Sequence, residues 1–151
     1  MDSSAITPNA PTWTELLPGT NGVTSGPWNS VSWSPQLKLF VAVSGSDTPV
    51  IYSSDGVNWT AIAKDTNGVF KSNWNSITWS PEINRFVAVA FAYLSGPYKS
   101  VVMYSSDGIN WTTISLGQNG TGNGAQWNSI TWSPELNRFV AVSDGGYYTI
   151  M

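Results

Sequence analysis

The stretch "WNSITWSPEINRFVAV" at residues 74–89 decides the fold, because the chain contains it three times with few changes. It reads "WNSVSWSPQLKLFVAV" at residues 28–43 and "WNSITWSPELNRFVAV" at residues 127–142. The first two copies are followed by "YSSDGVNWT" at residues 52–60 and "YSSDGINWT" at residues 104–112. Internal similarity at such intervals indicates an array of one repeated structural unit.

Each repeat divides into four short runs with the composition of β-strands. The run that begins at the tryptophan is rich in β-branched and aromatic residues and ends at Ser-Pro, where proline stops ladder pairing. The "FVAV" run is apolar on both alternating faces, as expected of a strand between two other layers. Two further runs flank the Ser-Ser-Asp-Gly segment. Four antiparallel strands per repeat, covered on both faces, predict an all-β protein: a β-propeller of four-stranded antiparallel blades, three blades per chain.

We expect residues 1–151 to form a single half-propeller domain, with blade units that start near Trp28, Trp74 and Trp127. The second unit carries an insertion, Ala90–Val101, which is rich in aromatic residues and is expected to form a surface loop. Loops longer than their counterparts are often functional, although this one could equally pack over the ring or against the partner chain.

Composition excludes several classes of chemistry. The chain has no cysteine and no histidine, so it cannot build disulfides, thiol nucleophiles, histidine triads or His/Cys zinc sites, and we expect no metal and no cofactor. Its six Lys and Arg are scattered and the net charge is −3, so a nucleic-acid partner is not expected. The sequence has no apolar run for a membrane helix and no signal-peptide pattern, which favours a cytoplasmic location without a membrane partner.

The Ser-Ser-Asp-Gly segments resemble the Asp-box (S-x-D-x-G-x-x-W) of sialidase-like and related propellers, with one residue fewer between Asp and Gly. The order "WNSIT", "FVAV" and "YSSDGxNW" is similar to the Asp-box-like repeats of many propeller proteins, and it covers residues 13–151. This resemblance implies a propeller fold with a structural Asp-box turn, away from any active site. Such repeats occur in enzymes, lectins and scaffolds alike, so they imply no single function.

An Asp-Gly pair between two β runs is also a hairpin signal in its own right. We expect the carboxylate to accept backbone N–H groups, the glycine to supply a positive φ, and the following tryptophan to anchor the corner. The predicted structural-turn residues are Asp55, Gly56, Trp59, Asp107, Gly108 and Trp111.

The third repeat lacks a fourth strand, and the N-terminus supplies one. "APTWTELLPGTNG" at residues 10–22 aligns with "GVNWTAIAKDTNG" at residues 56–68. Because propellers have about 4–8 blades, we expect a homodimer that forms a six-bladed ring, in which Trp13–Leu17 is the closing outer strand of the partner's third blade. A homotrimer and an excised or engineered half of a longer propeller are the alternatives. The residues expected at this closure are Trp13, Leu16 and Ile150.

For function we favour a non-catalytic, lectin-like module that binds glycans, because sugar recognition uses aromatic platforms beside amides and repeated weak sites gain avidity. Packing between blades is the competing interpretation of the same residues, and a structural or protein-interaction scaffold is the alternative function. The candidate ligand-binding residues stand at the start of each first strand: Trp28, Asn29, Trp74, Asn75, Trp127 and Asn128.

No catalytic residue is expected. A glycoside hydrolase needs two carboxylates near one substrate, whereas the acids here fall mostly in repeated turns. Sialidase-like enzymes use three arginines, and this chain has Arg85 and Arg138 alone, at equivalent positions, with Lys38 in the first unit. We expect these two arginines to pair with Glu82 and Glu135 across the turn.

Overall fold

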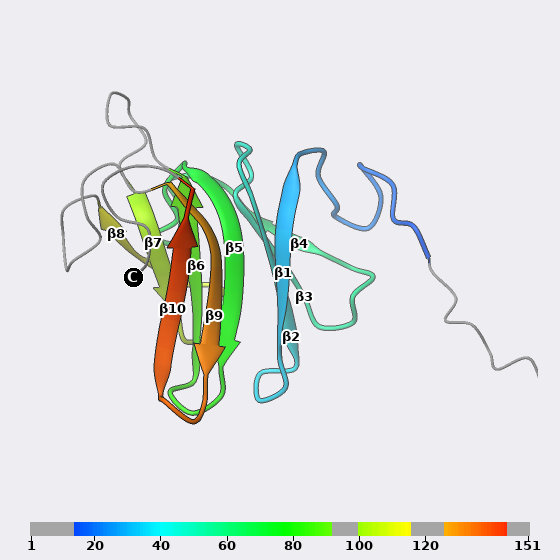
Figure 1. The fold of residues 1–151 in the computed structure, drawn as a ribbon. Helices are drawn as coiled ribbons and strands as arrows, with labels where there is room; N and C mark the ends of the chain where they lie inside the picture. Colours follow the sequence, from blue (N-terminus) through cyan, green and yellow to red (C-terminus); the bar gives the residue numbers. More distant parts are fainter. Residues whose placement is uncertain (1–13, 92–99, 116–125, 145–151) are drawn as a thin grey trace, which may run out of the picture.

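The computed structural model describes residues 14–91, 100–115 and 126–144, in which every regular element is a β-strand (Figure 1). We call the three sheets of the described residues blades 1 to 3 in chain order, and blade 1 consists of β1 (Trp28–Ser34), β2 (Leu39–Ser44), β3 (Val50–Ser53) and β4 (Thr60–Ile62). Blade 2 consists of β5 (Asn73–Ser80), β6 (Arg85–Phe91), β7 (Ser100–Ser105) and β8 (Thr112–Ser115). The described part of blade 3 consists of β9 (Trp127–Ser133) and β10 (Arg138–Ser143).

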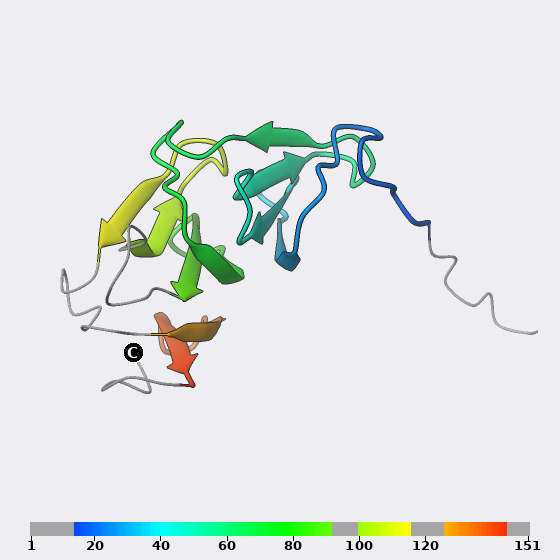
Figure 2. The ribbon, with the colours of Figure 1, turned by 90° about the horizontal axis from the view of Figure 1, so that it is seen from above.

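Each blade is an antiparallel meander. The strand orders are β1-β2-β3-β4 and β5-β6-β7-β8, and β9 pairs with β10. Seen from above, the three sheets fan out, with β1, β5 and β9 side by side on the inner side and β4 and β8 at the periphery (Figure 2). The predicted all-β architecture with four-stranded antiparallel sheets is therefore confirmed.

The turn between the first two strands of each blade corrects one assignment from the sequence. Lys38, Asn84 and Asn137 have positive φ values of 50°, 50° and 49°, in the left-handed region that asparagine adopts more readily than most residues. Lys38 is therefore the counterpart of the two asparagines, and its placement with the arginines is wrong. Leu39 occupies the position of Arg85, since each opens the second strand of its blade.

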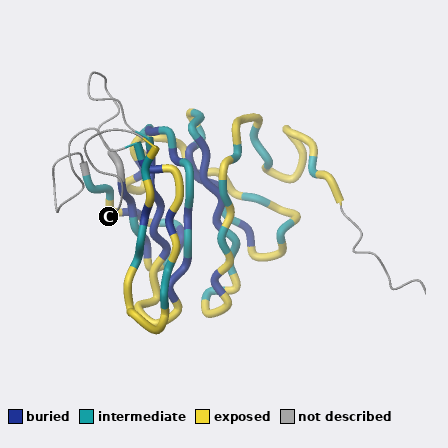
Figure 3. The backbone as a smooth tube through the Cα atoms, viewed as in Figure 1, coloured by how far each residue is buried: buried dark blue, intermediate teal, exposed yellow. Residues whose placement is uncertain are grey.

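The hydrophobic core lies between the blades. We call the face of a blade that packs on the preceding blade its front face, and the opposite face its back face. In blade 2 the front face carries Phe86 and Ala88 and the back face carries Val87 and Val89, all 8% exposed or less. β6 is thus buried on both sides, as the "FVAV" pattern predicts, and the dark core follows the contact between sheets (Figure 3).

The segment before β1 repeats the linker that joins blade 1 to blade 2. Residues 17–23 and 63–69 form the same turn, in which a threonine hydroxyl donates to the carbonyl three residues earlier at 2.6 Å. In both, a backbone N–H donates at 2.7 Å across the turn, from Gly19 to Val23 and from Asp65 to Val69. The alignment of residues 10–22 with 56–68 therefore holds in the described part, and it places Leu16 at the position of Ile62 in β4. Trp13, Ile150 and residues 92–99 of the insertion lie outside the described residues.

Candidate functional site

The Ser-Ser-Asp-Gly turn of blade 1 is held together by the Asp55 carboxylate. Oδ1 accepts the N–H groups of Val57 at 2.8 Å and Asn58 at 2.7 Å, and the Ser53 hydroxyl donates to it at 3.0 Å. Oδ2 accepts the side-chain amide of Asn58 at 2.9 Å. Gly56 has φ of 74°, and its carbonyl accepts the indole N–H of Trp59 at 3.2 Å. The carboxylate therefore shapes the corner, and the indole ties the next strand to it.

Blade 2 builds the same corner around Asp107. The N–H groups of Ile109 and Asn110 donate to Oδ1 at 2.8 and 2.7 Å, and the Asn110 amide donates to Oδ2 at 2.8 Å. Gly108 has φ of 76°, and the Trp111 indole donates to its carbonyl at 3.2 Å. Sequence reasoning missed the first serine of the motif, Ser105, whose hydroxyl accepts the N–H of Gly108 at 2.9 Å.

These donors keep both carboxylates charged. The side-chain amide of Asn58, followed by two backbone N–H groups, holds the pKa of Asp55 well below its ordinary value of 3.8. Partial burial works to raise the pKa of Asp107, but the amide and N–H of Asn110 outweigh it and lower the pKa to about 2. A charged carboxylate surrounded by donors is an acceptor that fixes a turn.

The Trp-Asn-Ser segments join neighbouring blades. Asn29 Nδ2 donates to the carbonyl of Trp74 at 2.8 Å, and one blade further on Asn75 Nδ2 donates to the carbonyl of Trp127 at 2.9 Å. The next residue repeats as well, since Ser30 Oγ accepts the N–H of Ile77 at 3.2 Å, and Ser76 Oγ accepts that of Ile130 at 3.2 Å. Each Asn-Ser pair therefore bridges to the first strand of the following blade.

The tryptophans of these segments lie largely inside the protein. Trp74 is 0% exposed and Trp127 is 1% exposed, and the Trp74 indole donates to the carbonyl of Phe70 at 3.1 Å. Trp28 makes the matching bond to Thr24 at 3.1 Å and is half-buried. An indole without an exposed face offers no stacking surface to a sugar, so Trp74 and Trp127 act here as packing residues. Asn128 is exposed.

A second pair of tryptophans, near the C-terminal ends of β5 and β9, donates hydrogen bonds to the preceding blade. Trp79 Nε1 donates to Gln36 Oε1 at 2.8 Å, and Trp132 Nε1 donates to Glu82 Oε2 at 2.5 Å. Glu82 is thus an indole acceptor, and Arg85 lies over the ring of Tyr104 with 4.8 Å to its centroid. The expected pairing of Arg85 with Glu82 is therefore not the arrangement found, because each side chain meets a partner on a different sheet or strand.

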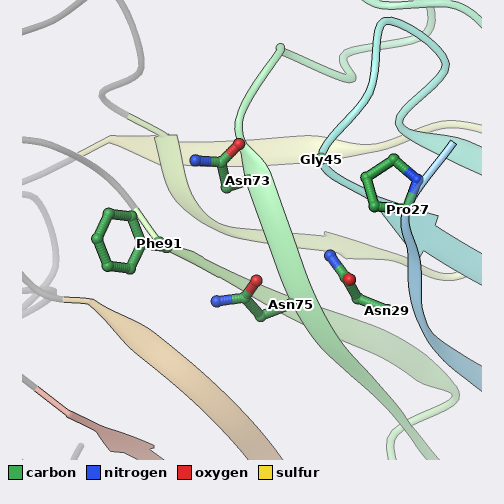
Figure 4. A pocket seen from close by; sticks show the side chains of 6 residues that line it. All are labelled: Pro27, Asn29, Gly45, Asn73, Asn75 and Phe91. Atoms are coloured by element: carbon green, nitrogen blue, oxygen red, sulfur yellow. The ribbon is translucent and has the colours of Figure 1, made fainter.

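An amide-lined pocket of about 300 Å³ opens between blades 1 and 2. Its lining side chains are uncharged and include three asparagines: Pro27, Asn29, Gly45, Asn73, Asn75 and Phe91. In Figure 4 the amides of Asn73 and Asn75 project toward the side of the Phe91 ring, while Pro27, Asn29 and Gly45 come from blade 1. The structure thus brings together Asn29 and Asn75, two of the residues expected at a ligand site.

Sequence reasoning missed four members of this pocket: Pro27, Gly45, Asn73 and Phe91. Asn73 precedes Asn75 by two residues, so strand alternation places both on one face, and that signal could have identified it. Phe91 ends β6, and Gly45 follows β2 at the matching place in blade 1, where a Cβ would lie 3.1 Å from Asn73 Oδ1. Nothing in the sequence marks these two as neighbours of Asn73, because they come from different blades.

Two other site types are not found within the described ranges. No group of three or more acidic residues is arranged to hold a metal ion in residues 14–91, 100–115 and 126–144. The same part of the chain contains no helix long and apolar enough to cross a membrane.

Comparison with known proteins bears on the fold. Neither a protein-family model nor a curated protein matches the sequence. Among solved structures, a chain in the crystal structure of a nidogen/laminin complex, a β-propeller, is similar with a TM-score of 0.55 and 15% identity. The match covers 76% of this chain and 40% of that one, so this chain spans less than half the length of its neighbour. At this identity the likeness shows the fold alone: a β-propeller-like, all-β arrangement.

Proposed function

We propose that this protein is a non-catalytic β-propeller module that binds carbohydrate in the amide-lined pocket between blades 1 and 2. In this proposal two copies assemble by strand exchange into a symmetric six-bladed ring, a size within the usual range for propellers. The observation that carries the binding proposal is the pocket itself, which offers several amides and no charged side chain.

The chemistry of the pocket suits neutral sugars. Asn29 and Asn75 each use Nδ2 to bond the next blade, and within the described residues their Oδ1 atoms accept no hydrogen bond. These oxygens are oriented acceptors for sugar hydroxyls, and the Asn73 amide and the Phe91 ring add a donor and an apolar surface. Because the lining is uncharged and the chain carries a net charge of −3, neutral glycans are favoured over sialylated ones.

A related set of amides occurs one blade further on. Gln126 forms an isolated antiparallel backbone bridge with Phe91. The side chains of Asn75 and Asn128 also approach each other, with 3.5 Å between Asn75 Nδ2 and Asn128 Oδ1. In a ring, similar junctions repeat around the axis, and several weak sites raise the avidity for a multivalent glycan without any new contact.

The test is a glycan array that includes neutral hexose and N-acetylhexosamine glycans beside sialylated ones. The Asn73→Ala variant removes a pocket amide that forms no hydrogen bond between blades in the described part of the chain, and loss of one hydrogen bond of about 1.4 kcal/mol weakens binding about tenfold. The matched control is Asn137→Gly, because Asn137 is exposed in the β9–β10 turn with φ of 49°, which glycine adopts readily. Absence of binding across the panel would refute the proposal and leave the scaffold as the function to pursue.

A further inference from the structure

Two blade junctions within the chain use one set of polar contacts. At each, an asparagine of the earlier blade donates to a tryptophan carbonyl of the later one, and a serine hydroxyl accepts an N–H of the later blade. A third contact joins an indole N–H of the later blade to a side-chain oxygen in the first turn of the earlier one. The junction is therefore a repeated interface, and the same polar contacts are expected wherever a further blade with the same residues packs against it.

The apolar part of the junction is equally regular on the front face of blade 2. The side chains on this face and its flanking linker are buried against blade 1, and six of them share one core cluster with Ile62 of β4 in blade 1: Val69, Trp74, Ile77, Ala88, Met103 and Trp111. The space that they face is filled by Val41, Val43 and Val50 from the back face of blade 1.

Blade 1 has the same front face, and no other blade packs on it within residues 14–91, 100–115 and 126–144. The counterparts of these six residues and of Ile62 line an open apolar pocket of about 240 Å³: Leu16, Val23, Trp28, Val31, Ala42, Ile51 and Trp59. Val31 is 59% exposed, whereas its counterpart in blade 2, Ile77, is 5% exposed. Trp33 is 39% exposed, whereas its counterpart Trp79 is 7% exposed. The front face of blade 1 is therefore an uncovered half of the junction seen inside the chain.

The complementary half is uncovered on blade 3. Val142 is 44% exposed, while its counterparts on the back faces of blades 1 and 2, Val43 and Val89, are 0% exposed. Leu136, in the turn that follows β9, is 69% exposed, while Leu37 in the same turn of blade 1 packs against the core. One end of the array thus exposes the surface that the other end is shaped to receive.

We propose that the back face of blade 3 covers the front face of blade 1 of a second copy of this chain, in the register of the two internal junctions. Asn128 Nδ2 then donates to the carbonyl of Trp28 of the second copy, and Ser129 Oγ accepts the N–H of its Val31. The indole of its Trp33 donates to Glu135, the counterpart of Gln36 and Glu82. This inference details the ring on which the proposed function rests, and it does not depend on carbohydrate binding.

The segment before β1 is placed to complete this junction. The turn over residues 17–23 matches that over 63–69. Relative to its turn, Thr14–Leu16 therefore occupies the position that β4 of blade 1 occupies relative to the second turn. In the described residues Thr14–Leu16 has no strand partner, while Ile62 of β4 pairs with Val50 of β3. In the assembly Thr14–Leu16 forms the outer strand of the second copy's third blade, and two reciprocal junctions close six blades with two-fold symmetry.

Native mass spectrometry or light scattering on the full chain provides the first test. We expect a mass of twice 16.3 kDa. The Val31→Arg variant places a charge in the junction and should raise the dissociation constant at least about a hundredfold, because an unpaired buried charge costs several kcal/mol. The control is Phe70→Arg, since Phe70 is 52% exposed and belongs to neither core cluster. A folded wild-type monomer would overturn the junction, and a mass of three chains would overturn its closure by two.

Cross-linking tests the register and does not need a variant that dissociates the two chains. The chain has no cysteine, so Trp33→Cys with Glu135→Cys introduces the only thiols, and a short bismaleimide should join two chains across the proposed contact. Phe70→Cys with Glu135→Cys should yield no such product, and equal yields from the two pairs would refute the register. A dimer that binds no glycan would contradict the proposed function alone. A monomer that binds glycan would contradict this inference and the proposed ring, but it would leave the proposed carbohydrate binding intact.

Discussion

The charge of Asp107 should make a measurable, pH-dependent contribution to stability. The Asp107→Asn substitution keeps the size of the side chain and one acceptor oxygen but removes the charge that four donor groups surround. A fall of the pKa from 3.8 to about 2 corresponds to at most about 2.5 kcal/mol, since one pKa unit is worth about 1.4 kcal/mol. Solvent screening at this half-exposed corner reduces the expected loss to about 1 kcal/mol at neutral pH.

The sign of the pH dependence follows from the lowered pKa. The contribution of the folded carboxylate is complete above the unfolded value of 3.8 and is lost as the pH falls toward about 2. Wild type should therefore be more stable than Asp107→Asn at pH 7, and the difference should shrink between pH 4 and pH 2. Asp55 titrates in both proteins, so the difference between their curves isolates Asp107.

The assay is urea unfolding followed by tryptophan fluorescence from pH 2 to pH 7, at one protein concentration because the proposed assembly would make unfolding concentration-dependent. Asp65→Asn is the control, since Asp65 is exposed and its φ of 61° suits asparagine. A difference that stays constant over the whole pH range would show that the charge of Asp107 contributes nothing, and the argument for the turn would then be wrong.

Three further substitutions test other parts of the fold by the same unfolding assay. Asn75→Ala should cost about 1 kcal/mol, because it removes a hydrogen bond between blades; an unchanged midpoint would show that the bond is replaceable. Gly108→Ala should destabilise more than Gly19→Ala, because both have positive φ but a Cβ at Gly108 would lie 2.7 Å from Leu39 Cδ2, whereas Gly19 faces open space; equal effects would argue against crowding at the blade junction. Asp47→Asn should leave stability within error, although Lys71 and Lys64 lower the pKa of Asp47, because the Asp47 carboxylate that both lysines contact is exposed to solvent; a clear loss would contradict this.

Local sequence determined the strands and their corners. The Trp-Asn-Ser and Phe-Val-Ala-Val runs predict β5 and β6, and the proline after Ser80 predicts where β5 ends. The Asp-Gly pair at Asp107 predicts a hairpin corner with a positive φ. These features depend on neighbours within a few residues, so a repeat read along one chain is sufficient to find them.

The tertiary structure decided what the repeated side chains contact. Asn29 and Trp74 are 45 residues apart, and the bond between them exists because two sheets pack face to face. The same packing buries Trp74, and the pocket combines Gly45 with Asn73 and Phe91 from a different blade. Sequence alone set the repeating unit, because strand and turn preferences are local. Which copies of a residue are buried, and which remain exposed, followed only from the position of each blade in the array, since burial depends on the neighbouring blade.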